Sequence, residues 1–162
     1  MRIATLTALT AASAIVAHAA TPTKTPAKPF DARDPGALVS LLTTMAAKAA
    51  ITGTSTGSIF LDIKTPGGDF GAQFVDCDAK GVACRAVVFS TAFATRDASF
   101  AQMNSFNKGQ VACRGYIADD GRPNVAYATL VNLRMTTEEM KQHIGLWQGC
   151  LGAFGQAIRP PP

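Results

Sequence analysis

Four cysteines are the residues of this 162-residue chain whose type and number point most directly to chemistry: Cys77, Cys84, Cys113 and Cys150. An even number of cysteines in an exported chain favours disulfides, and four cysteines permit three pairings. A zinc site is the alternative, but the chain has no Cys-x-x-Cys pair and no histidine beside a cysteine. The lack of a Cys-x-x-Cys pair also argues against a redox enzyme, so we predict structural disulfides.

The sequence favours one pairing of these cysteines. Cys77 and Cys84 flank a predicted turn at residues 78–81, so they can face each other across a hairpin at a separation that a disulfide allows. Cys113 would then pair with Cys150 on the last predicted helix, and the bond would staple that helix to the sheet. Two buried free thiols at 113 and 150 are the alternative.

His143 is the other side chain that could take part in acid–base chemistry, because it is the only histidine outside the N-terminal leader. It has no serine, cysteine or acidic partner at a motif spacing, so we expect a solvent-facing histidine or one at the edge of an apolar stripe. No serine lies in a Gly-x-Ser-x-Gly motif, and the aspartates at positions 76, 78, 119 and 120 belong to predicted turns without an EF-hand pattern. We therefore predict no catalytic, metal-binding or cofactor-binding residue, and no cofactor.

Residues 1–19 have the pattern of a secretory signal peptide. Arg2 precedes an uncharged run rich in Ala, Leu and Ile, and Ala17-His18-Ala19 predicts cleavage after Ala19. The run is short and rich in small residues, so we expect no stable membrane insertion after cleavage, an N-terminal anchor helix being the alternative. Residues 20–33, rich in Pro, Thr and Lys, are predicted to be a linker. The expected location is the periplasm, with secretion beyond the cell left open.

The charge of the chain is a mild basic excess. The net charge of +4 falls to about +3 when Arg2 leaves with the leader. No run or stripe of Lys and Arg stands out, so nucleic acid is not an expected partner. We interpret the charge as a contribution to solubility.

The elements that must position these side chains begin with a helix. Asp34 is placed to cap it and Pro35 to occupy its first position, and we expect the helix to end near residues 51–53. Alternating apolar residues then predict three antiparallel strands, separated by glycine-rich or aspartate-rich turns. These strands are expected at residues 59–64, 70–77 and 83–93.

The second half of the chain predicts two helices around a hairpin. Asp97 or Ser99 can cap the first of these helices, and Asp-Gly followed by Pro turns the hairpin between strands at 110–118 and 125–133. Thr136, with Glu139 three residues later, predicts a capping box for the last helix. The order α-β-β-β-α-β-β-α indicates an α+β domain with one antiparallel sheet of about five strands, packed with helices.

An apolar stripe runs the length of the last predicted helix. Its members are Met140, Ile144, Trp147, Leu151, Phe154 and Ile158. We expect the stripe to pack in the core, and part of it, namely Trp147, Leu151 and Phe154, is the candidate interaction or dimer face, because one side of a single sheet can lack covering helices.

The order and spacing of several residues in the second half resemble the YbjN family. The shared features are Asn104, Phe106-Asn107, Arg114-Gly115-Tyr116-Ile117, the Asp-Gly turn and Leu146-Trp147. The resemblance covers residues 34–159 and leaves 160–162 as a Pro tail. It implies a fold like that of type III secretion chaperones, which are dimers that bind partner segments without catalysis. YbjN-like proteins are described as sensory-transduction regulators, but the leader and the predicted disulfides depart from the cytoplasmic members.

These observations lead to a functional expectation. We expect a non-catalytic, exported YbjN-like protein, homodimeric, that binds a protein partner in a chaperone-like way or acts as a sensory or regulatory module. The alternatives are a small periplasmic enzyme with an unrecognised site and a structural accessory protein of the cell envelope. The sequence does not identify the partner.

Overall fold

The computed structural model describes residues 29–159, which form three helices and one six-stranded antiparallel sheet. The predicted signal peptide, most of the predicted linker and the Pro tail lie outside these residues. The elements follow one another as α1 (Pro35–Thr44), β1 (Lys48–Ser55), β2 (Ser58–Lys64), β3 (Phe70–Val75), β4 (Ala86–Ala92), α2 (Phe100–Gly109), β5 (Arg114–Ile117), β6 (Pro123–Leu130) and α3 (Thr137–Ala157). The α+β class and the single antiparallel sheet are confirmed, with six strands in place of about five.

The additional strand is β1, and its position corrects the predicted end of the first helix. α1 ends at Thr44, Ala46 adopts a left-handed backbone with φ of 57°, and Lys48–Ser55 then pairs with β2. The alanines of this stretch favour a helix, but pairing with a neighbouring strand outweighs that intrinsic preference. Because β1 lies at the edge of the sheet and is mostly exposed, it also lacks the alternation of apolar and polar residues that signals a strand.

The strands are arranged in the order β1-β2-β3-β4-β6-β5, and every neighbouring pair is antiparallel. β1 and β5 are therefore the two edges of the sheet. The hairpin predicted in the second half is present as β5 and β6, although β5 is shorter than the predicted strand at 110–118.

Side-chain caps fix where each helix begins. The Asp34 carboxylate accepts a hydrogen bond from the Gly36 N–H at 2.9 Å at the start of α1. Of the two candidates for α2, Ser99 forms the cap, in a capping box with Gln102. Thr136 and Glu139 form the predicted capping box of α3, in which Glu139 accepts a hydrogen bond from the Thr136 N–H at 2.7 Å. These pairings satisfy backbone donors that a helix start leaves free.

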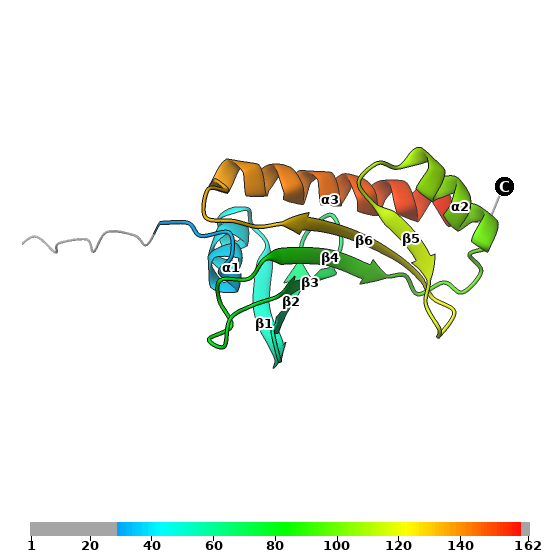
Figure 1. Cartoon of the computed structure of the whole chain (residues 1–162). Helices are drawn as coiled ribbons and strands as arrows, with labels where there is room; N and C mark the ends of the chain where they lie inside the picture. The colour runs from blue at the N-terminus through cyan, green and yellow to red at the C-terminus, as the bar shows by residue number, and fades with distance from the viewer. Residues whose placement is uncertain (1–28, 160–162) are drawn as a thin grey trace, which may run out of the picture.

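The core lies between the helices and one face of the sheet. Figure 1 shows α3 lying lengthwise over the sheet, α2 beside β5, and α1 near β1 at the other end. Trp147 of α3 meets the ring of Phe70 at a centroid distance of 5.6 Å, and Phe154 meets Phe106 of α2 at 4.9 Å. Edge-on aromatic contacts of this kind add to the stabilisation that burial provides.

Candidate functional site

The face of the sheet that points away from the helices, here called the outer face, is the broadest candidate surface. Buried residues of all three helices join the inward-facing side chains in one core, so no helix of residues 29–159 covers this face. Strand alternation and register assign its side chains. They include Phe60, Asp62, Lys64, Gln73, Val75, Ala86, Val88, Ser90, Arg114, Tyr116, Asn124, Ala126, Ala128 and Leu130.

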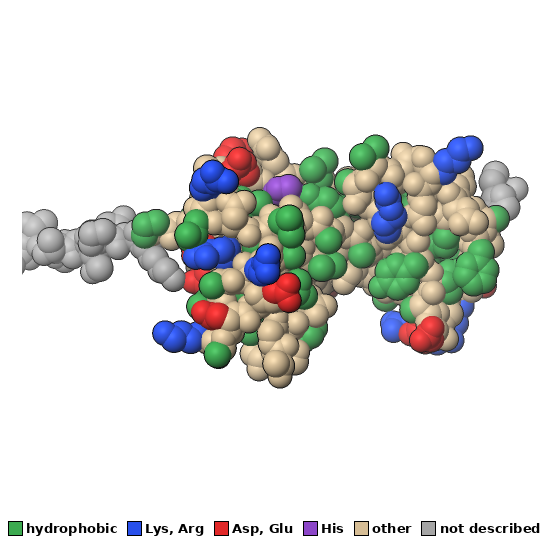
Figure 2. Space-filling view, in the orientation of Figure 1, with side chains coloured by type: hydrophobic (Ala, Val, Ile, Leu, Met, Phe, Trp, Pro, Cys, Tyr) green, Lys and Arg blue, Asp and Glu red, His purple; other side chains and the backbone are tan. Residues whose placement is uncertain are grey.

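The centre of the outer face is formed by small or uncharged side chains. In one row across the sheet, Gln73 lies opposite Val88, and Val88 lies opposite Ala128. An open hollow of about 450 Å³ lies where Asp62 and Gly71 meet Ser90. Figure 2 views the molecule from the side, with α3 along the top, and in this view the charged side chains gather toward the two ends of the molecule.

The β5 edge of the sheet is closed by a side chain of α2. The Asn107 Oδ1 accepts a hydrogen bond from the Gly115 N–H at 2.7 Å, and the Asn107 Nδ2 donates one to the Gly115 carbonyl at 3.0 Å. The amide group therefore occupies the place of a neighbouring strand at Gly115. β1 differs, because no strand of the described residues lies on its free side.

Two disulfides are present, Cys77–Cys84 and Cys113–Cys150, and the described residues include no free cysteine. The favoured pairing is thus the one found. Cys113 and Cys150 are buried, with their Cα atoms 6.0 Å apart, and the bond ties α3 to the segment that leads into β5. Disulfides of this kind are typical of proteins that fold in an oxidising compartment.

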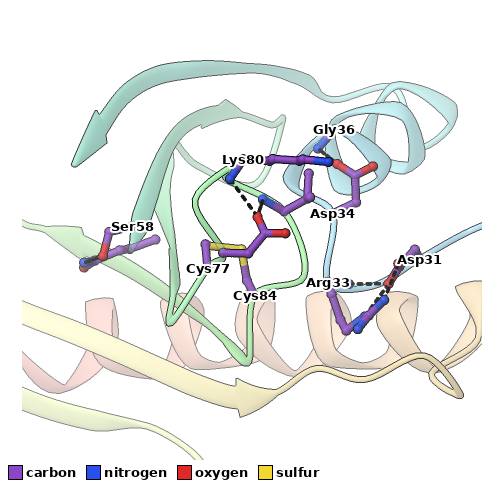
Figure 3. Close-up of a disulfide and its surroundings, with 11 residues drawn as sticks. Asp31, Arg33, Asp34, Gly36, Ser58, Cys77, Lys80 and Cys84 are labelled. Atoms are coloured by element: carbon purple, nitrogen blue, oxygen red, sulfur yellow. Dashed lines mark hydrogen bonds and ion pairs between the residues drawn. A yellow bond between two sulfur atoms is a disulfide. The ribbon is translucent and has the colours of Figure 1, made fainter. Parts of the chain in front are cut away.

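The Cys77–Cys84 disulfide closes a loop that is hydrogen-bonded on several sides (Figure 3). Within the loop, the Asp78 Oδ1 accepts hydrogen bonds from the backbone N–H groups of Lys80 and Val82 at 3.0 and 2.9 Å. The Cys84 N–H donates to the Arg33 carbonyl at 3.1 Å, just ahead of α1. Because Cys84 is buried in the core and hydrogen bonds hold the backbone around the pair, we assign the disulfide a structural role.

The predicted interaction residues on α3 are core residues. Trp147 and Phe154 are fully buried and Leu151 is 8% exposed, so a partner could reach them only if the core opened. The indole Nε1 of Trp147 has no hydrogen-bond partner within residues 29–159, which indicates that this side chain contributes by packing. The core interpretation of the stripe is therefore correct, and its use as an interaction or dimer face is not compatible with the folded protomer.

His143 has a partner that its sequence neighbourhood does not reveal. Its Nδ1 is hydrogen-bonded to the hydroxyl of Tyr127 on β6. Burial raises the pKa of Tyr127, and the tautomer of the imidazole decides which of the two groups donates in this hydrogen bond. His143 lines an open hollow of about 450 Å³ together with Arg134 and Gln142, among others. The pair orients the ring, but no serine, cysteine or acidic side chain in residues 29–159 forms a hydrogen bond to it.

The described part of the chain contains neither a membrane-spanning helix nor a cluster of metal ligands. None of its helices is long and apolar enough to cross a membrane. No group of three or more His, Cys, Asp or Glu side chains in residues 29–159 is arranged to hold a metal ion.

Comparison with known proteins gives a likeness to solved structures and none to a family model or a curated sequence. The crystal structure of YbjN from E. coli, described as a candidate transcription regulator, aligns with 74% of this chain and 88% of that chain, at a TM-score of 0.44 and 13% identity. A likeness at this level carries no inference about function. The fold described above rests on the sheet and helices of this chain alone.

Proposed function

We propose that this protein is an exported, non-catalytic binding protein that holds a helical segment of a protein partner against the outer face of its sheet. The main support for the proposal is that no helix of residues 29–159 covers the outer face, although the centre of this face is uncharged. Apolar side chains that share an exposed surface and have polar neighbours, as Ala86, Val88 and Ala128 do here, are a feature of interaction sites.

The backbone chemistry of a sheet face favours a helix as the bound segment. The N–H and C=O groups of β2, β3, β4 and β6 are directed at neighbouring strands, so the face offers side chains and no backbone partners. An extended peptide laid on this face would leave its own backbone groups unpaired, whereas a helix satisfies them internally. Sheet and helix layers also pack readily in α+β proteins.

The side chains of the outer face define what the partner helix should present. Ala86, Val88 and Ala128 are small or short, so they admit a close approach of a stripe of small or apolar residues. Asp62 and Lys64 on β2 and Arg114 on β5 add charges only toward the sides of the face. We expect an amphipathic helix with an uncharged stripe and polar flanks.

The disulfides and the predicted leader support the proposed compartment. Both disulfides need oxidising conditions to form and persist. Together with the predicted cleavage after Ala19, they support a periplasmic protein, and the expected partner is another exported protein.

The test is partner capture that depends on the outer face. The tagged, exported protein is cross-linked in cells, purified and analysed by mass spectrometry against an unrelated tagged periplasmic protein. Ala128→Lys places a charge at an exposed position of the outer face, and Leu146→Lys does so at an exposed position of α3 as the matched control. We expect one partner to be captured by the wild type and Leu146→Lys and lost with Ala128→Lys. Equal capture by both variants would contradict the proposal.

The Tyr127–His143 pair supports a second candidate, a small periplasmic enzyme that uses His143 as a base. This reading predicts that His143→Gln abolishes function and that Ala128→Lys leaves it intact. The binding reading predicts the reverse, so the two variants separate the candidates.

A further inference from the structure

We propose that β1 pairs antiparallel with β1 of a second copy of this chain, which joins the two sheets edge to edge. This inference goes beyond the proposed function, because it concerns the edge of the sheet and not its outer face.

The composition of β1 leaves its edge nearly unprotected. An exposed edge strand is usually shielded by charges, proline, a bulge or a covering element. β1 has one charged residue, Lys48 at its first position, and no proline. A bulge between Ile51 and Gly53 interrupts its pairing with β2, but the preceding stretch from Lys48 to Ile51 pairs regularly. That stretch is open to another strand.

Ile51 gives this edge an apolar side chain that needs cover. It lies opposite Leu61, which is buried, so its side chain is on the helix side of the sheet, yet it is 51% exposed. In an antiparallel pair that keeps the helices of both copies on one side, opposite residues share a face. Ile51 then lies opposite Ala49 or Ile51 of the other copy, and both arrangements bury apolar surface.

The charge of β1 favours a second copy arranged antiparallel. Antiparallel pairing places the two Lys48 residues at opposite ends of the ladder, whereas parallel pairing in register would place them side by side. A two-fold symmetric pair also uses the same surface of each protomer, so one open edge is sufficient.

The closed β5 edge limits the assembly to two copies. Since Asn107 occupies the outward-facing backbone groups of Gly115, a third chain cannot add there in the same way. Edge pairing through β1 alone gives a closed dimer and not a fibre. The outer faces of the two protomers would form one continuous surface.

Sedimentation equilibrium of the purified, oxidised protein over a range of concentrations tests this pairing. Ile51→Lys brings two like charges together near the two-fold axis, and Val111→Lys, at a position that is 96% exposed in the segment before β5, is the matched control. We expect a wild-type dimer, an increase in its dissociation constant of about tenfold or more with Ile51→Lys, and no change with Val111→Lys. The Ala128→Lys variant should dimerise as the wild type does, even though it no longer captures the partner. A failure of this inference can therefore be told apart from a failure of the proposed function.

Hydrogen exchange provides a readout that does not depend on a variant. Amide exchange in residues 48–55 should slow as the protein concentration rises, whereas exchange in β5 should not. A wild type that remains monomeric at every concentration, or an Ile51→Lys variant that dimerises as well as the wild type, would overturn the proposal. Assembly into open-ended oligomers would also overturn the proposal. So would slower amide exchange in residues 48–55 of a monomeric protein that is caused by an exported partner.

Discussion

Asn107 and Gly115 form a paired contact in which one side-chain amide satisfies both backbone groups of a residue in an edge strand, with distances of 2.7 and 3.0 Å. The contact joins α2 to β5 and makes the two edges of the sheet different. One edge is closed by a side chain, and the other, β1, is open. The contact therefore bears on both stability and assembly.

Replacing Asn107 should destabilise the protein and open the β5 edge. Asn107→Ala leaves the half-buried N–H and C=O of Gly115 without their partner, which costs about 1–3 kcal/mol of the free energy of unfolding. Urea denaturation measures this loss, and Asn104→Ala, an exposed position on the same helix, is the control. A free energy of unfolding equal to that of the wild type would show that the contact is not stabilising. We also expect faster aggregation, because a strand edge becomes accessible.

Gly115 should not tolerate a side chain. A Cβ at this position would lie 2.5 Å from Cε2 of Phe154 and 3.1 Å from Cδ1 of Phe106. Overpacking of this kind costs about 1–3 kcal/mol, so Gly115→Ala should lower the melting temperature. The matched control is Gly149→Ala on α3, where a Cβ meets nothing within 4 Å. That change should raise stability by about 0.5–1 kcal/mol, because alanine favours a helix more than glycine does. The same direction of change in both variants would refute the packing argument.

The two disulfides should contribute different amounts to the free energy of unfolding. The chain-entropy model gives about 2.4 kcal/mol for the Cys77–Cys84 loop and about 3.8 kcal/mol for the Cys113–Cys150 loop, from their sequence separations of 7 and 37 residues. We therefore expect the Cys113→Ser/Cys150→Ser double variant to lose more stability than the Cys77→Ser/Cys84→Ser double variant. Denaturant unfolding of both variants and the wild type makes the comparison. The opposite order would mean that the hydrogen-bonded loop at 76–85 depends on its disulfide more than chain entropy implies.

The capping box of α3 should make stability sensitive to acid. Hydrogen bonds from the backbone and then the side chain of Thr136 lower the pKa of Glu139 below its usual value of 4.5. A carboxyl with a depressed folded-state pKa stabilises the fold above its unfolded pKa, and this contribution is lost as the pH falls through the folded pKa. We expect Glu139→Gln to reduce the fall in melting temperature below about pH 4.5, since Gln keeps a capping acceptor, as Gln102 does in α2. An unchanged acid profile would argue against the cap.

Local chemistry made much of the fold predictable from the sequence. Asp34 and Thr136 begin their helices as expected because a cap needs only a polar side chain at the right short spacing. The Cys77–Cys84 pair was predictable because a turn brings the two residues together. The Asp-Gly turn likewise located the hairpin of β5 and β6.

Contacts between distant segments were harder to predict. Tyr127 and His143 lie on different elements, so no spacing rule connects them. β1 forms because it pairs with β2, whereas the residues of β1 by themselves favour a helix. The sequence therefore does not predict the open edge of the sheet. Periodicity identified Trp147 and Phe154 as one apolar stripe but could not show that the whole stripe faces the sheet. The outer face became recognisable only when the helices were placed.

The central claim, that the outer face binds a helix of an exported partner, is tested most directly by site-specific photo-cross-linking in cells. A photoreactive amino acid replaces Ala128 on the outer face in one strain and Leu146 on α3 in another, and the attachment points are mapped by mass spectrometry. We expect a cross-link from position 128 to one exported protein, within an amphipathic helical segment that has an uncharged stripe, and no cross-link from position 146. No adduct from position 128, or the same adducts from both positions, would contradict the claim.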